Sequence, residues 1–295
     1  PITFQKVVSY VKKRDCAKSY LLLKDIFPQN AVDIEKLSNK GIIYRYFRAK
    51  EKKLYRVSDF IGTMSEGNTR FLLEHNKFVE KEFVEVNPNS AKIRDHIPLS
   101  SVEKRKIKKK MGIDDTKLVL LYGGNLGAPQ GINFLLEIVN YLEKLDEVCL
   151  LIVGSGTEYK NIEKYLVNNQ ITNTKLYPSL PKSDYIKVEQ CADIGLVFLD
   201  YRFTIPNIPS RMLGYLQASL PILAATDANT DFKDIIVENG FGKWSLHGDL
   251  KAFIENIELM KDPNLQQIMV RNGYDYLKKY CDVKNSYNKI IAHFN

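Results

Sequence analysis

The stretch that most constrains the fold runs from 118 to 139 and reads LVLLYGGNLGAPQGINFLLEIV. It begins with an apolar run, continues through the pair Gly123-Gly124, and ends in apolar residues spaced three and four apart. This order predicts a strand, a glycine turn and the N-terminus of a helix. Glycines let a ligand approach the backbone, and the free N–H groups of a first helical turn attract negative charge. The stretch is therefore a candidate anion site, although many such turns are purely structural.

The same unit recurs along the second half of the chain. Apolar, strand-like runs are expected at 118–122, 148–153, 174–177, 194–199 and 221–225. Helix-like segments follow them at 131–145, 158–169, 183–191, 210–218 and 231–238. Strands that alternate with helices of this size predict βαβ units and a parallel sheet with helices on both faces. Ligands of such sheets bind at the carboxyl ends of the strands, where these glycine, proline and polar loops fall.

The first half predicts a smaller unit of the same α/β class. Short strands are expected at 19–23, 59–65 and 83–86, with a helix over about 41–56. Ser65 is placed to cap a helix that begins near Glu66. We therefore predict two Rossmann-like parallel-sheet domains that face a cleft, the first one partial. The expected divisions are a first domain at 1–100, a linker at 101–117, a second domain at 118–280, and a C-terminal helix at 281–295 that packs back on the first domain.

Basic residues indicate which partners the chain can have. The formal charge is +8, and cations alternate with aromatic residues between Lys36 and Arg56. That mixture suits an anionic membrane surface or a nucleic acid, and the lack of a nucleic-acid motif favours the membrane. A second basic run, Lys104 to Lys110, is typical of a solvated helix face. No apolar run approaches the roughly 20 residues that span a bilayer, so peripheral attachment is expected.

The spacing of cysteine and histidine argues against a metal site. No CxxC pairing occurs among Cys16, Cys149, Cys191 and Cys281, and the histidines lack ligand spacing. Reduced thiols in a cytoplasmic protein are therefore expected, with no bound metal. The chain begins with Pro1 rather than methionine, so we expect it to start inside a longer protein.

Several motifs occur in an order typical of one enzyme family. The second half contains GGNLGAPQG, LLIVGSG, LYPSLP and PSRMLGYLQASLPILA, and the first half contains LLLKDIFPQNAVD, YRVSDFIGTMSEGN and VNPNS. This order resembles that of GT-B glycosyltransferases of family 4, with the donor domain second and the later part of the acceptor domain first. KDIFPQ, IGTMSEGN and the stretch from SRMLGYLQASLP to NTD are most similar to bacterial polysaccharide enzymes. Those enzymes attach amino sugars of the N-acetylfucosamine type to lipid-linked intermediates.

The resemblance implies a retaining transferase that moves a sugar from UDP to a lipid-linked saccharide in capsule or O-antigen biosynthesis. Such an enzyme would work at the cytoplasmic face of the bacterial cell membrane, peripherally attached to it. It would need no cofactor beyond the UDP-sugar donor and no metal, because two backbone anion sites can replace a cation. The resemblance also implies that the opening strands and first glycine turn of the acceptor domain are missing here.

The resemblance assigns residues to the donor. For the diphosphate they are Gly124, Asn125, Gly127, Ser210, Arg211 and Met212, and for the nucleoside they are Gly154, Gly156, Leu180 and Pro181. Arg211 would also be catalytic, because a cation beside the leaving diphosphate stabilises the transition state more than the ground state. Ordinary roles remain open: Ser210 can simply cap its helix, Arg211 can be exposed, and the glycines can be structural turns.

The resemblance also assigns residues to the sugar and the acceptor. They are Ser65, Glu66, Asn207, Asn229, Thr230 and Asp231, with Asp25 as a catalytic residue. Many family members have a histidine at the place of Asp25, and a carboxylate there can accept the proton of the acceptor hydroxyl. Asp25 can equally cap a turn, and Glu66 can interact with a helix dipole. Thr230 or Asp231 can cap the following helix.

Two positions depart from the family pattern. The paired glutamates of the family would fall at Pro206 and Gly214, and neither is a glutamate here. The second glutamate normally hydrogen-bonds the ribose of the donor, so this contact has no assigned residue. The departures keep open a catalytically inactive subunit that binds a sugar nucleotide. An epimerase-type enzyme on the same fold is a further alternative, but it needs an acid–base pair, and the sequence offers no convincing second carboxylate.

Overall fold

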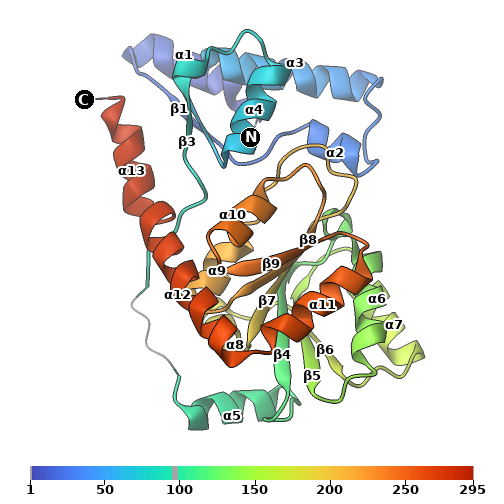
Figure 1. Cartoon of the computed structure of the whole chain (residues 1–295). Helices are drawn as coiled ribbons and strands as arrows, with labels where there is room; N and C mark the ends of the chain where they lie inside the picture. Colours follow the sequence, from blue (N-terminus) through green and yellow to red (C-terminus); the bar gives the residue numbers. More distant parts are fainter. Residues whose placement is uncertain (1, 95–98, 295) are drawn as a thin grey trace.

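The structure is a computed structural model that describes residues 2–94 and 99–294. It contains two α/β units, each built on a parallel sheet (Figure 1). The second unit has six strands in the order β6-β5-β4-β7-β8-β9. They are β4 (Leu118–Asn125), β5 (Val148–Ser155), β6 (Thr174–Tyr177), β7 (Ile194–Phe198), β8 (Ile222–Thr226) and β9 (Gly242–Leu246). The predicted α/β class with parallel sheets is confirmed.

Helices cover both faces of this sheet, because neighbouring strand residues point to opposite sides. They are α6 (Ile132–Leu142), α7 (Tyr159–Asn168), α8 (Lys182–Glu189), α9 (Arg211–Gln217), α10 (Phe232–Glu238), α11 (Leu250–Met260) and α12 (Pro263–Tyr280), and the short η3 (Ala128–Gln130) precedes α6. Leu120 and Tyr122 of β4 lie in the core shared with α6, α7 and α11. Val119 and Leu121 lie in the core shared with α8, α9 and α10. The apolar strands of the sequence are therefore buried on both faces.

The chain changes direction across this sheet between β4 and β7. It first builds outward from β4 through β5 and β6, and it then continues on the other side of β4 with β7, β8 and β9. β4 pairs with β7 at Leu120 and Leu121. Beyond this pairing the hydroxyl of Tyr215 joins the two strands: it accepts from the N–H of Gly123 at 3.0 Å and lies 3.2 Å from the carbonyl oxygen of Leu196. Open α/β sheets bind ligands at such a switch point.

The first unit has a three-stranded parallel sheet in the order β1-β2-β3. The strands are β1 (Tyr20–Leu23), β2 (Phe60–Thr63) and β3 (Val84–Val86). The helices are η1 (Ile2–Phe4), α1 (Gln5–Asp15), α2 (Gln29–Asp33), α3 (Ile42–Val57), α4 (Glu66–His75) and η2 (Lys81–Phe83). Its core is small and consists of Leu23, Tyr55, Ile61 and Leu72. Within the described chain β1 is an edge strand, and its Leu22 is 41% exposed.

Residues 101–117, which the sequence predicts as a linker, are helical and partly buried. α5 (Ser101–Lys110) begins with a capping box in which Ser100 and Glu103 exchange hydrogen bonds. Most of its basic side chains are exposed. Met111 and Ile113 are each only 6% exposed, and they belong to the core of the second unit. This segment therefore packs as part of the second unit.

The chain returns to the first unit near its C-terminal end (Figure 1). α13 (Val283–Ala292) follows α12, and Ala91 bridges the junction. The N–H of Ala91 donates to the carbonyl of Cys281 at 2.9 Å, and the N–H of Val283 donates to the carbonyl of Ala91 at 3.0 Å. Just after α13, the ring of His293 stacks on Phe60 with 4.0 Å between centroids. The last helix therefore lies against the first sheet.

Candidate functional site

A cleft of about 950 Å³ lies between the two units. The first unit lines it with residues that include Lys24, Asp25, Phe27, Asn30, Met64 and Asn89. The second unit lines it with residues that include Gly123, Gly124, Asn125, Ser179, Leu180, Tyr185, Glu189, Asn207, Ser210, Arg211 and Gly214. The residues assigned from the sequence that do not line the cleft are Gly127, Met212, Gly154, Gly156, Pro181, Ser65, Glu66, Asn229, Thr230 and Asp231. The cleft therefore brings together seven of the 17 assigned residues.

Arg211 is the central cation of the second-unit wall. Its guanidinium lies over the ring of Tyr122 at 4.5 Å from the centroid. A Cβ added to Gly124 would lie 3.7 Å from its Nη2. Its Nη1 is buried and has no hydrogen-bond partner among the residues that the structure describes. Because an unsatisfied buried donor costs about 1–3 kcal/mol, this guanidinium is suited to bind an anion.

The glycine turn contributes less to this site than the sequence predicts. β4 continues to Asn125 instead of ending at 122, and Gly124 has a φ of +115°, which glycine adopts readily. The N–H of Gly127 donates to Oε1 of Gln130 at 3.1 Å, and Nδ2 of Asn125 donates to the same oxygen. Gly127 is therefore already satisfied, and the part of the turn that faces the cleft is Gly124 and Asn125.

Neighbouring residues at the start of α9 face either the cleft or the core. Ser210 and Arg211 line the cleft. The N–H of Met212 donates to the carbonyl of Pro209 at 3.2 Å, and its side chain is buried in the core. Met212 therefore has a structural role rather than the assigned contact with the diphosphate.

The two glycines assigned to the nucleoside allow close packing of the backbone. A Cβ at Gly154 would lie 1.9 Å from the carbonyl oxygen of Gly124, and a Cβ at Gly156 would lie 2.1 Å from that of Leu126. A side chain at either position would push β5 away from β4 and the loop that follows it. Both glycines therefore shape the cleft without lining it.

Asp25 and Lys24 follow β1 on the first-unit wall. Asp25 is exposed, and within the described part of the chain its carboxylate accepts no hydrogen bond, so it does not cap the following turn. Lys24 donates to the carbonyl oxygens of Asn87 at 2.9 Å and Pro88 at 3.1 Å. Burial lowers the pKa of Lys24 to about 8. This wall therefore presents a free carboxylate beside an anchored amine.

Asp231 joins the two units instead of lining the cleft. Its Oδ1 accepts from the hydroxyl of Ser65 and its Oδ2 accepts from the N–H of Gly67, both at 2.7 Å. These two bonds, which we call the Asp231 contact, place a carboxylate at the N-terminus of α4, where the helix dipole favours negative charge. Ser65 also caps α4 as predicted, by accepting from the N–H of Asn68. Glu66 is exposed beside this contact.

Asn229 and Thr230 fix the loop that carries Asn207. Nδ2 of Asn229 donates to the carbonyl of Phe203 at 2.6 Å, and the hydroxyl of Thr230 donates to that of Asn207 at 2.7 Å. Their backbone N–H groups donate to Oδ1 of Asp227. Burial raises the pKa of Asp227 to about 6. These residues support the wall from behind, and Asn207 itself reaches the cleft.

The cysteines offer no reactive thiol at the cleft. Cys149, Cys191 and Cys281 are buried and free, and burial raises the pKa of Cys191 to about 11 and that of Cys281 to about 12. Across residues 2–94 and 99–294, no group of three or more histidine, cysteine, aspartate or glutamate side chains is arranged to hold a metal ion.

Comparison with known proteins assigns the family. The model of the family described as "Glycosyl transferases group 1" matches residues 103–276, more than half of the chain. The chain belongs to the group 1 glycosyltransferases. The match covers most of α5, the whole six-stranded sheet, α9 with Arg211, and most of α12.

Individual relatives of this group 1 glycosyltransferase agree with that assignment. The chain is 24% identical over 236 residues to the probable glycosyltransferase WbjE of Pseudomonas aeruginosa, which covers 76% of this chain and 55% of that protein. It is 25% identical over 160 residues to the putative colanic acid biosynthesis glycosyl transferase WcaI of Escherichia coli K12. This aligned region is 53% of this chain and 39% of that protein. The chain thus spans about half, or less, of the length of these curated relatives.

A solved structure shares the fold of this chain. The Anabaena protein Alr3699/HepE, solved in complex with UDP and glucose, matches with a TM-score of 0.75 and 15% identity over 98% of this chain and 75% of that one. The likeness confirms the predicted GT-B fold.

One carboxyl group in the cleft of this group 1 glycosyltransferase was not predicted from the sequence. Glu189 ends α8 and is only 4% exposed. Burial raises its pKa to about 7, and the charge of Arg94 acts in the opposite direction. Glu189 follows Tyr185 by four residues and Ile186 by three, which places all three on one helix face, and all three line the cleft. An acidic residue on the apolar face of a predicted helix was the signal that could have found it.

Proposed function

We propose that the chain belongs to a glycosyltransferase that moves a sugar from a UDP-sugar to an acceptor. The observation that carries this proposal is the buried guanidinium of Arg211, with its unsatisfied Nη1 at the switch point of the second sheet. A diphosphate is the anion that suits a cation beside a glycine turn in this fold. The Anabaena relative, solved with UDP and glucose, supports uridine as the nucleoside.

In this proposal the diphosphate lies between Gly124 and Arg211. Cleavage of the glycosidic bond adds negative charge to the leaving diphosphate, and a fixed guanidinium stabilises that charge more in the transition state than in the ground state. Asp25 lies on the opposite wall, and its free carboxylate accepts or orients the proton of the attacking hydroxyl. Arg211 thus acts on the leaving diphosphate oxygen, and Asp25 acts on the attacking hydroxyl oxygen of the acceptor.

We further propose that transfer retains the anomeric configuration and that the donor carries an N-acetylamino sugar such as N-acetylfucosamine. The acceptor in this proposal is a lipid-linked saccharide of a bacterial surface polysaccharide. Support comes from the motifs KDIFPQ and IGTMSEGN and from the likeness to WcaI, which is described as a colanic acid biosynthesis enzyme.

We propose that α3 attaches the protein to an anionic membrane surface. Ile42, Ile43 and Tyr46 are 85%, 59% and 54% exposed, and the exposed cations of the same helix include Arg45, Lys53 and Arg56. Apolar side chains surrounded by cations are typical of a helix that lies in a membrane interface. Over the described ranges, the structure contains no helix with both the length and the apolar character needed to cross a bilayer.

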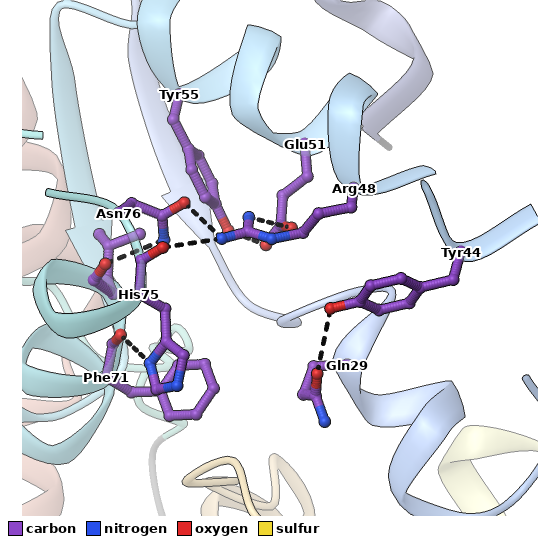
Figure 2. Close-up of polar contacts among 9 residues, drawn as sticks. Gln29, Tyr44, Arg48, Glu51, Tyr55, Phe71, His75 and Asn76 are labelled. Atoms are coloured by element: carbon purple, nitrogen blue, oxygen red, sulfur yellow. Dashed lines mark hydrogen bonds and ion pairs between the residues drawn. The ribbon is translucent and has the colours of Figure 1, made fainter. Parts of the chain in front are cut away.

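Arg48, which the sequence groups with these cations, faces inward. Figure 2 shows its guanidinium between Glu51 and the end of α4. It pairs with Glu51, and its Nη2 donates to the carbonyl of His75 at 2.9 Å and to Oδ1 of Asn76 at 2.8 Å. Tyr55 donates a second hydrogen bond to Glu51 at 2.6 Å. Arg48 therefore holds α3 on α4 and is not part of the surface proposed to bind lipid.

Isothermal titration calorimetry with UDP tests the proposed donor site. Arg211→Ala should weaken UDP binding about tenfold to a hundredfold, because a charge-assisted phosphate contact is worth about 1.5–3 kcal/mol. Arg105→Ala is a matched control: Arg105 pairs with Asp115 on the exposed face of α5 and is 70% exposed. Equal UDP affinity in wild type and Arg211→Ala would remove Arg211 from the site. Hydrolysis of the donor by the full-length protein separates an enzyme from an inactive binding subunit.

A further inference from the structure

Glu189 and Gly214 share one place in the cleft. A Cβ built on Gly214 would lie 2.5 Å from Oε1 of Glu189 and 3.5 Å from its Cδ. Gly214 lies inside α9, where glycine costs about 1 kcal/mol relative to alanine. Its φ is not positive, so the backbone does not require glycine there. What the missing side chain provides is room for the carboxyl group that α8 extends toward α9.

The carboxyl group of Glu189 has no hydrogen-bond or ion-pair partner in the described structure. The titratable groups that act on it or are acted on by it are Arg94 before α5, Tyr185 on its own helix and Tyr215 on α9. Arg94 is itself held by Gln217, with 3.0 Å between its Nε and Oε1 of Gln217. Burial of a carboxyl group without a partner is unfavourable. Glu189 therefore has free hydrogen-bonding capacity at the wall of an open cleft.

The place of this carboxyl group relative to Arg211 indicates what it binds. Arg211 and Gly214 are three residues apart on α9, or about 4.5 Å along the helix axis. A nucleoside diphosphate held at Arg211 has its ribose next to the diphosphate, and the ribose carries two adjacent hydroxyl groups. A carboxylate can accept a hydrogen bond from each, and carboxylates recognise ribose hydroxyls in other α/β folds.

We propose that Glu189, reaching from α8 into the space left by Gly214, binds the ribose hydroxyl groups of the donor nucleotide. This inference rests on the proposed function, because it requires a nucleoside diphosphate in the cleft. In this arrangement α8 supplies the carboxylate contact with the ribose, which α9 cannot supply because Gly214 has no side chain. This inference also removes the main reason to consider the chain an inactive binding subunit, because the carboxylate is relocated rather than lost.

Deoxynucleotides test this assignment. Calorimetry at about pH 8, where the carboxyl group of Glu189 is ionised, should give the wild-type chain about tenfold weaker binding of 2′-deoxy-UDP or 3′-deoxy-UDP than of UDP. Glu189→Gln keeps the shape of the side chain, so its folding can be checked by a thermal melt. This variant should bind UDP about tenfold more weakly and should no longer distinguish UDP from at least one of the deoxynucleotides.

A second set of variants moves the carboxylate between helices. Glu189→Ala should lose the discrimination, and the double variant Glu189→Ala/Gly214→Glu should regain at least part of it, because the carboxylate then comes from α9. Gly214→Ala alone displaces the end of the Glu189 side chain. It should weaken UDP binding while the melting temperature changes little.

The outcomes separate this inference from the proposed function. Absence of UDP binding by the wild-type chain would overturn both. UDP binding that depends on Arg211, with the discrimination intact in Glu189→Gln, would overturn the role of Glu189 alone. Discrimination that is present in the wild type and lost in Glu189→Gln would support it.

Discussion

Polar groups at the second-unit wall of the cleft lack hydrogen-bond partners among the described residues, whereas those at the contact between the two units are paired. At the wall, Nη1 of Arg211 is buried without a hydrogen-bond partner, and the carboxyl group of Glu189, a residue that is 4% exposed, accepts no hydrogen bond in the described part of the chain. At the Asp231 contact, both carboxylate oxygens are paired at 2.7 Å with Ser65 and Gly67. Because buried polar groups in native proteins are nearly always satisfied, the exceptions at the wall indicate a ligand, whereas the paired groups build the architecture.

The largest effect on activity is expected at Asp25, across the cleft from the second-unit wall. It is a free carboxylate on the first-unit wall, and Asp25→Asn removes its charge and basicity without changing its size. Sugar transfer by the full-length protein should fall by about 100-fold or more, since general bases contribute that much. UDP affinity should stay the same. Glu74→Gln, which changes an exposed carboxylate of α4 outside the cleft, should keep full activity. Full activity in Asp25→Asn would leave Asp25 without a catalytic role.

Paired and unpaired cations of α3 give a second test. Arg45, Lys53 and Arg56 form no ion pair among the described residues, whereas Arg48 pairs with Glu51. Replacing the three unpaired cations by glutamine should weaken binding to anionic vesicles roughly a hundredfold, because each contributes about 1 kcal/mol near such a surface. The effect should shrink as salt is added. The control replaces Lys106, Lys109 and Lys110 of α5, and equal losses in the two triple variants would contradict a specific role of α3.

The Asp231 contact should matter for stability and not for the nucleotide. Asp231→Ala removes two charge-assisted hydrogen bonds, so the free energy of unfolding should fall by about 1.5–3 kcal/mol. UDP affinity should remain within about twofold, because Asp231 does not line the cleft. Asp234→Ala, an exposed carboxylate on the same helix, controls for helix effects in urea denaturation. A large loss of UDP affinity with stability unchanged would reverse the roles given to the two regions.

The unpaired carboxyl group also predicts a pH dependence. Burial raises the pKa of Glu189 from 4.5 to about 7, so between these values the folded state holds more protons than the unfolded state. Stability should therefore fall as pH rises through this window. Burial also raises the pKa of Asp227, to about 6, which contributes in the same direction. Glu189→Gln should therefore make the fall of stability with pH less steep without abolishing it. Urea denaturation of the wild type and of Glu189→Gln between about pH 4.5 and 7.5 measures how the stability of each changes with pH. Equal pH dependence of the two proteins would show that Glu189 is not buried as described.

The smallest effect is expected at Gly127. Its N–H is already bonded to Gln130, so Gly127→Ala should leave UDP affinity within about twofold. Gly124→Ala places a Cβ beside Arg211 at a φ of +115° and should weaken UDP binding clearly. Calorimetry of the two variants side by side would show whether Gly124 or Gly127 faces the phosphate.

The sequence predicts the second sheet well because its strands are apolar runs between glycine and proline loops. β9 escapes prediction, since GKWSL at 242–246 has neither an apolar run nor a clear alternation. The position of Arg211 in the cleft also follows from the motif order. The partners of polar residues do not: Ser65 and Asp231 are 166 positions apart, and no local pattern indicates that they meet. Burial follows from periodicity, but the pairing of polar groups depends on how the two units are placed.

The two hydrogen bonds of Ala91 tie together the two places where the chain crosses between the units. Because the two crossings are fastened side by side, we expect any opening of the cleft to turn the units about this junction. α2 lies on the far side of the cleft from α13 (Figure 1), so contacts such as Asp33 with Thr204 move furthest when the units swing apart.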